Sequence, residues 1–213
     1  MTEVLLIRHG ETAWNAERRL QGHIDIELND TGMRQAELLA QALRGEPLDA
    51  IFASDLTRAR QTAAPLAAAL GLPVAIERNL RERCYGAFEG LRYTDIGTHY
   101  PEAYAAMQAR QLDFRYPAGA NVAETLNEFS ARSVGAVMRL LRSASYPKVA
   151  IVTHGGVLDC LNRAARGADM SRPRDFDIPN AGINRLQWDG EKFKILQWAD
   201  VEHLASDALD ELQ

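Results

Sequence analysis

A chain of 213 residues is long enough for one sizeable α/β domain with a full hydrophobic core. Apolar residues make up 46% of the sequence and charged residues 25%, a balance that is ordinary for a globular protein and excludes extensive disorder. A formal net charge of −5 argues against a general nucleic-acid binder, because such a protein presents a basic face.

Short apolar runs alternate with helical patterns along the chain. Runs of this length are typical of strands that are buried on both faces of a parallel sheet. The expected strands are residues 4–7, 50–53, 74–76 and 149–152. Three helices are expected between these strands and after them. The first follows the turn at residues 29–32 and ends at Gly45, the second covers residues 56–70, and the third runs from Val157 to Arg166.

Residues 80–121 have a different character. They contain aromatic residues, glycines and two prolines, and we expect an insertion or lid beside the sheet. Asn121 and Glu124 have the spacing of a capping box, which predicts that a long helix begins there.

The C-terminal part is expected to form a hairpin. An Asp-Gly turn at residues 189–190 separates two strand-like segments, residues 183–189 and 192–198. The last dozen residues are acidic and are expected to form a loosely held helix or a tail.

The order of these elements predicts a three-layer α/β/α sandwich with a mostly parallel central sheet. We expect a single domain over residues 1–213, with the lid at about 80–121. The hairpin and the exposed sheet edges leave a homodimer open.

The cellular location is expected to be the cytoplasm. The two cysteines, Cys84 and Cys160, are too few for a disulfide framework. No basic and then apolar leader opens the chain, and no apolar stretch approaches the ~20 residues that a membrane span needs. We therefore expect neither a nucleic acid nor a membrane as partner.

Polar residues follow three of the expected strands. His9 comes directly after the first strand and precedes Gly10, and His154 stands in the same position after the fourth strand, before Gly155. Ligands of parallel sheets bind beyond the carboxyl ends of the strands. Each histidine alone fits a structural role as well as a catalytic one, but two in equivalent positions favour catalysis. A neutral imidazole is a good nucleophile near pH 7.

Arginines at the same edge of the sheet predict an anion site. Arg8 directly follows a buried strand, where an unused charge would be costly, and Arg58 lies just beyond the second strand. The planar guanidinium suits the oxygens of a transferring phosphoryl group. Glu82 is a candidate proton donor, although chemistry alone gives little reason to choose it among 29 acidic residues.

The sequence argues against two other kinds of site. Cys160 and Arg166 have the Cys-x5-Arg spacing of cysteine-dependent phosphatases, but the residues between them contain no glycine and look helical. Glu11, Asp25 and Asp55 lack the spacing of metal ligands and are better interpreted as caps and loop residues, so we expect no metal.

Several ordered motifs resemble the histidine phosphatase superfamily, in its phosphoglycerate mutase-like branch. They span residues 4 to about 160 and occur in the order that this family has. The matching segments are residues 6–15, 21–28, 31–32, 54–63, 80–82 with 86 and 89–90, and 152–156.

The resemblance implies a role for each matching residue. His9 would be the phosphorylated nucleophile, with Arg8, Arg58 and His154 around the phosphoryl group. Glu82 would protonate the leaving group and then act as base for water. Asn15 and the backbone of Gly155 would bind the phosphoryl group. The residues implied near the rest of the substrate, a small phosphorylated metabolite, are Gln21, Gly22, Arg83, Cys84 and Tyr85. No cofactor is implied.

The sequence is compatible with three functions. A phosphomonoesterase is favoured, because residues 86–90 resemble the phosphatase branch and no lysine precedes Lys148 to match the lysine of the mutases. A phosphoglycerate mutase is the alternative, since Arg92, Arg110 and Arg115 offer contacts to an acidic substrate. A non-catalytic protein that binds a phosphorylated ligand is disfavoured, because His9, Arg58 and His154 are all present.

Overall fold

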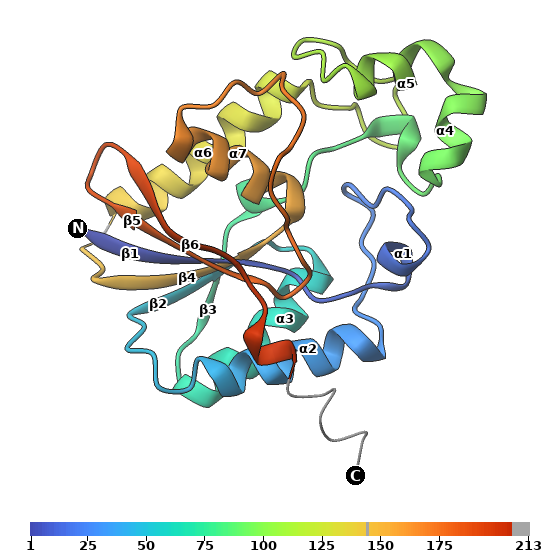
Figure 1. Cartoon of the computed structure of the whole chain (residues 1–213). Coiled ribbons are helices and arrows are strands. Elements are labelled where there is room, and N and C mark those ends of the chain that lie inside the picture. Colours follow the sequence, from blue (N-terminus) through green and yellow to red (C-terminus); the bar gives the residue numbers. More distant parts are fainter. Residues whose placement is uncertain (144, 206–213) are drawn as a thin grey trace.

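The computed structural model describes residues 1–143 and 145–205, so most of the expected acidic C-terminal tail lies outside the described residues. The described chain forms a six-stranded sheet in the order β3-β2-β4-β1-β5-β6 (Figure 1). Neighbouring strands are parallel from β3 to β1, and β5 and β6 are antiparallel to their neighbours. The strands are β1 (Thr2–Arg8), β2 (Ala50–Ala53), β3 (Val74–Ile76), β4 (Lys148–Thr153), β5 (Ile183–Trp188) and β6 (Phe193–Asp200).

Helices cover both faces of this sheet, which confirms the predicted three-layer sandwich. The helices of the two outer layers are α2 (Asp30–Ala42), α3 (Thr57–Leu70), α6 (Leu126–Ser143) and α7 (Gly155–Arg166). Side chains of β1 alternate between two cores: Val4 and Leu6 pack with α6 and α7, whereas Leu5 and Ile7 pack with α2 and α3. The apolar run of β1 is therefore continuous because both of its faces are buried.

A smaller group of elements lies over the carboxyl ends of the parallel strands (Figure 1). Its two helices are α4 (Tyr93–His99) and α5 (Pro101–Gln108). Its apolar centre comprises Leu20, Phe88, Ile96, Ala103, Tyr116 and Ala123. We call residues 86–123 the cap. It occupies the place where the sequence predicted a lid.

The remaining elements are short. They are α1 (Ala13–Ala16) and the 3₁₀ helices Arg78–Leu80, Gly86–Phe88 and Glu202–Leu204. No helix among residues 1–143 and 145–205 is long and apolar enough to cross a membrane.

The predicted start of the long helix α6 is wrong. Thr125, not Asn121, provides the capping box: the Thr125 hydroxyl accepts from the Glu128 N–H, and the Glu128 carboxylate accepts from the Thr125 N–H. Glu124 is therefore not a capping residue. Its carboxylate accepts from Arg132, a residue of α6, instead.

Candidate active site

Three neighbouring strands bring the predicted reactive residues together. His9 follows β1 and His154 follows β4, and these strands pair in parallel and in register up to the contact between Arg8 and Thr153. The two imidazole rings lie with their centroids 5.2 Å apart. Arg58, in the first turn of α3 beyond β2, reaches His154 with a distance of 3.3 Å between its Nε and the His154 Nδ1.

The hydrogen bond of His9 determines which ring nitrogen is free. His9 Nδ1 lies 2.7 Å from the carbonyl oxygen of Gly10. A carbonyl can only accept, so Nδ1 carries the proton and Nε2 keeps its lone pair. Burial, together with the charges of Arg58 and Arg8, lowers the pKa of His9 well below its ordinary value. At neutral pH His9 is therefore a neutral imidazole with an unprotonated Nε2, which is the form that a nucleophile requires.

His154 has the opposite arrangement of its ring proton. A guanidinium can only donate, so the Arg58 Nε–H donates to His154 Nδ1 and the proton of the neutral ring is on Nε2. Burial, followed by the charges of Arg58, His9 and Arg8, lowers the pKa of His154 well below its ordinary value. Its Nε2 is buried and has no hydrogen-bond partner among the described residues. An unsatisfied buried donor is costly, and an anion placed there would satisfy it.

Arg58 is a completely buried cation. Its Nη1 donates to the carbonyl of Ile24 and its Nη2 to the carbonyl of Gly22, while the side chain is 0% exposed. Burial lowers its pKa to about 10, so the guanidinium stays charged at neutral pH. A buried charge held only by neutral acceptors lacks a counter-ion, and this favours binding of an anion beside it.

Arg8 supplies a second cation. Its Nη1 donates to the carbonyl of Ile178 at 2.6 Å, whereas its Nε is buried without a partner among the described residues. Burial also lowers the pKa of Arg8. A Cβ at Gly155 would lie 3.5 Å from the Arg8 Nε, so the start of α7 and this guanidinium are in close contact. The free N–H groups at a helix N-terminus add partial positive charge at this point.

Glu82 places a carboxylate at the same helix terminus. Its Oε2 accepts from the Gly156 N–H at 2.9 Å and its Oε1 from the Arg83 N–H at 2.7 Å. Gly156 is required here, because a Cβ on it would lie 2.2 Å from Glu82 Oε1. The carboxylate therefore sits beside Arg8 and the two glycines.

A cavity of about 590 Å³ opens above these groups. Arg8, Glu82 and Gly155 form part of its wall, and Arg83 and Tyr85 line it as well. The cap closes one side, and a segment before β5 contributes Arg174 and Ile178. His9 is only 3% exposed and is not one of the residues that line this cavity. The arrangement is suited to a tetrahedral anion at the strand ends, with the rest of an ester in the cavity.

Comparison with known proteins decides the family. The family model for the histidine phosphatase superfamily (branch 1) matches residues 4–201. This chain belongs to the histidine phosphatase superfamily. The match confirms the predicted resemblance. Members of the superfamily act through a phosphohistidine intermediate.

Three similar proteins illustrate the range of the family. Phosphoglycerate mutase-like protein 4 of Arabidopsis thaliana is 40% identical over 95% of this chain and 86% of its own length. The metal-independent phosphoserine phosphatase of the same plant is 36% identical over 97% of this chain and 84% of its own. The solved structure of Bacillus stearothermophilus YhfR has a TM-score of 0.87 and 30% identity, and the match covers 96% of this chain and all of that one.

Four of the residues that were predicted to bind the substrate do not line the cavity. The Asn15 amide oxygen accepts from Thr12 and caps α1. Gln21 is buried, and its amide oxygen has no partner among the described residues. Gly22 has a φ of +54° and holds Arg58 through its carbonyl. Cys84 lines a separate hollow, and burial raises the pKa of its thiol to about 11.

Of the three arginines considered for an acidic substrate, only Arg110 lines the cavity. It donates through Nε to the Met170 carbonyl and through Nη2 to Asp159. Arg115 instead pairs with Glu128. Arg92 is exposed, and its backbone forms an isolated antiparallel β-bridge with the backbone of Arg19.

Sequence reasoning missed the segment before β5. Asn180 donates from Nδ2 to the carbonyl of His9 at 2.9 Å, and the Ala181 N–H lies 3.1 Å from the carbonyl of Arg8. Thr62 was missed as well: its hydroxyl accepts from the Gly10 N–H and donates to the Arg58 carbonyl. The turn chemistry of residues 179–182, Pro-Asn-Ala-Gly, was the available signal for the first group.

The alternative sites have other roles. Asp55 pairs with Arg81, Asp25 accepts from Thr57, and Glu11 accepts from Asn29. Within residues 1–143 and 145–205, no three His, Cys, Asp or Glu side chains are grouped as metal ligands would be. Cys160 and Arg166 both lie in the helix α7, which cannot form a phosphate-binding loop.

Proposed function

We propose that this chain is a metal-independent phosphomonoesterase that forms a phosphohistidine on His9. The observation that carries the proposal is the unprotonated Nε2 of a neutral His9 beside two cations, the buried Arg58 and the half-buried Arg8. This combination supplies a nucleophile together with positive charge for the phosphoryl oxygens. A phosphatase that uses a metal would obtain that charge from the ion instead.

The first step transfers the phosphoryl group to the protein. His9 Nε2 attacks phosphorus, the N–P bond forms, and the bond from phosphorus to the ester oxygen breaks. Arg8, Arg58, the His154 Nε2–H and the Gly155 N–H neutralise the charge on the equatorial oxygens. Glu82 gives its proton to the departing oxygen, so that an alcohol leaves rather than an alkoxide.

The second step restores the enzyme. Water attacks phosphorus, the ionised Glu82 takes a proton from that water, and the N–P bond breaks to release inorganic phosphate. His9 returns to its neutral form, still held by the Gly10 carbonyl. The same carboxyl group acts as acid and then as base, so neither step needs a cofactor.

The substrate proposed for this site is a small phosphorylated metabolite. Arg83 and Tyr85 contact its leaving group from the cavity wall, while Gly22 supports the site by holding Arg58 through its carbonyl. The relative named a phosphoserine phosphatase supports this class of substrate. We propose one domain for the whole chain, with the cap over the cavity.

A mutase is the second candidate function. Arg110 in the cavity wall favours it, because this side chain offers its Nη1 to an acidic group of a substrate. The relative named phosphoglycerate mutase-like supports the same reading. Against it, Arg115 is paired outside the cavity and no lysine precedes Lys148.

The test is a panel of phosphomonoesters assayed for phosphate release with a chelator present, beside an assay for interconversion of 2- and 3-phosphoglycerate. Release that persists with the chelator is expected. Interconversion that exceeds hydrolysis would make the protein a mutase. The His9→Ala variant should lose turnover together with acid-labile phosphate on the protein, and retained turnover would remove His9 from its role.

A further inference from the structure

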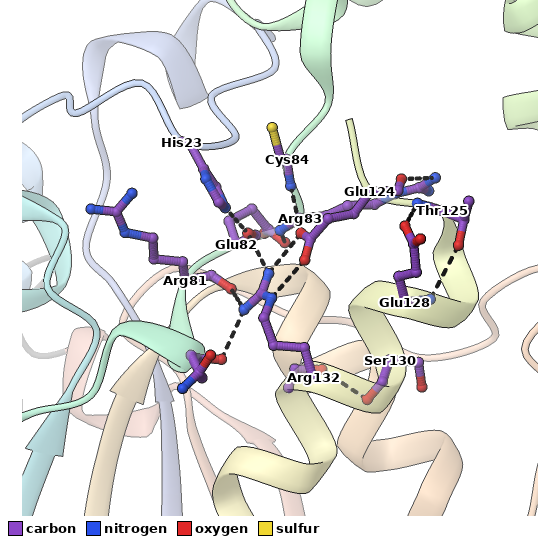
Figure 2. Close-up of polar contacts among 12 residues, drawn as sticks. His23, Arg81, Glu82, Arg83, Cys84, Glu124, Thr125, Glu128, Ser130 and Arg132 are labelled. Carbon is purple, nitrogen blue, oxygen red and sulfur yellow. Dashed lines mark hydrogen bonds and ion pairs between the residues drawn. The ribbon is translucent and has the colours of Figure 1, made fainter. Parts of the chain in front are cut away.

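The segment that carries Glu82 has no regular secondary structure of its own. It leaves the 3₁₀ helix Arg78–Leu80 and enters the next at Gly86–Phe88. A carboxylate on such a segment keeps its position only if the backbone beneath it is held. Figure 2 shows that this backbone faces α6, from which Arg132 points toward it.

Arg132 uses all five of its N–H groups in this contact. Its Nη1 donates to the carbonyls of Asn79 and Arg81, at 2.8 and 3.1 Å. Its Nη2 donates to the carbonyl of Glu82 at 3.1 Å and to the Glu124 carboxylate at 2.7 Å. Its Nε donates to the other Glu124 oxygen at 2.6 Å. Only the planar fork of arginine can satisfy five acceptors in this arrangement, since a lysine has three donors on one atom.

Glu124 and His23 hold the same segment. The Glu124 carboxylate accepts from the Cys84 N–H at 3.0 Å as well as from Arg132 (Figure 2). His23 Nε2 lies 2.9 Å from the Glu82 carbonyl, so this nitrogen donates. Burial lowers the pKa of His23, which keeps the ring neutral at pH 7 with its proton on that nitrogen. Every peptide group next to Glu82 is therefore fixed by a side chain from elsewhere in the fold.

We propose that Arg132 and Glu124 form a positioning pair for Glu82. Neither lines the cavity above the strand ends; both line the separate hollow behind the Glu82 segment. They act by holding the backbone so that the Glu82 carboxylate stays on the Gly156 N–H. The inference rests on the proposed function, since it needs Glu82 as the proton donor.

The test is a comparison of leaving groups in the Arg132→Lys variant. The kcat/KM value reports the step in which the ester oxygen leaves, and only an alkyl phosphate needs its oxygen protonated in that step. A displacement of about 1 Å costs roughly 100-fold. We expect kcat/KM to fall about 10- to 100-fold for an alkyl phosphate and less than about 3-fold for an aryl phosphate.

The matched control is Arg185→Lys. Arg185 is also an arginine in ion pairs, with the carboxylates of Glu3 and Glu46, and its side chain is 23% exposed against 19% for Arg132. It lies on β5, away from Glu82, and should slow neither substrate. Glu124→Gln is the second variant and should reproduce the selective loss, so the test does not depend on one protein folding well.

A cycle with Glu82→Gln separates the possible failures. If Arg132 acts through Glu82, adding Arg132→Lys to Glu82→Gln should cost the alkyl phosphate less than about 3-fold more. Equal slowing of both substrates by Arg132→Lys, or a full further loss in the double variant, would overturn the positioning role alone. A Glu82→Gln protein without any preference among leaving groups would overturn the proton-donor role itself, and the positioning role with it.

Discussion

Gly156→Ala is the sharpest perturbation of the proposed acid, because it places one methyl group against the Glu82 carboxylate. The added Cβ would lie 2.2 Å from Glu82 Oε1, more than 1 Å inside an ordinary non-bonded contact. It would also lie 3.0 Å from two ring atoms of Phe129, which is 1% exposed and cannot retreat. The carboxylate must therefore move by about 1 Å.

The expected loss in rate follows from that distance. A misplacement of about 1 Å costs on the order of 100-fold. We expect kcat/KM for an alkyl phosphate to fall by about this factor, while an aryl phosphate, whose leaving group needs no proton, loses less than about 5-fold. Stability should also fall, by about 2–4 kcal/mol, because the lost hydrogen bond of about 2 kcal/mol and the overpacking against Phe129 of about 1–3 kcal/mol outweigh the helix propensity of about 1 kcal/mol that alanine regains.

Steady-state kinetics with the two substrates would check this, with Gly135→Ala as control. A Cβ at Gly135, in α6, meets only the end of the flexible Arg139 side chain, at 3.2 Å, and should leave both rates unchanged. If Gly156→Ala slowed the two substrates equally, or slowed neither, the assignment of Glu82 as proton donor would be refuted.

Three further outcomes follow from the structure. The lowered pKa values of His9 and His154 mean that below pH 6.5 the unfolded chain binds protons that the folded chain does not. The free energy of unfolding should therefore decrease as the pH falls from 7.5 to 5.5, by up to about 1.4 kcal/mol per pH unit for each histidine. Urea titrations should show a shallower dependence in His154→Asn, and an unchanged slope would contradict the pKa direction. Cys84→Ala should keep kcat within about 3-fold. Iodoacetamide at pH 7.5 should not inactivate the wild-type protein, since the Cys84 thiol is buried and has a pKa of about 11. Rapid inactivation that Cys84→Ala abolishes would contradict the raised pKa of this thiol. Gly22→Ala should lower the free energy of unfolding, measured in urea, by about 2–3 kcal/mol. Gly22 has a φ of +54°, and a Cβ added there would lie 2.0 Å from Glu89 Oε1. A variant as stable as the wild type would mean that the turn relaxes without cost.

The core of the fold could be read from local patterns. Four apolar runs predict strands, and the structure has a strand at each of them. The strands β1, β2 and β4 are largely buried, whereas β3 lies at the edge of the sheet and is partly exposed. The placement of His9 and His154 beyond two such runs then follows, because parallel strands bring their carboxyl ends to one edge.

The start of α6 could not be read in the same way. Asn121 with Glu124 and Thr125 with Glu128 have the same capping spacing, so local chemistry does not choose between them. In the folded chain Glu124 binds Arg132, which also holds the carbonyl of Glu82, and Thr125 is the residue that caps the N-terminus of α6.

Local patterns in the chain are sufficient to predict the layered architecture, the histidines that follow two of the strands and the residue types of a phosphoryl site, since each depends on periodicity or on a neighbour in the chain. The tertiary structure alone decided the protonated nitrogen of each histidine, the place of the Glu82 carboxylate on the Gly156 N–H, and the support of His9 by Asn180. Glu82 and Gly156 are 74 residues apart, and His9 and Asn180 are 171 apart. Contacts at such separations depend on how whole layers pack, and no local preference of the chain encodes them.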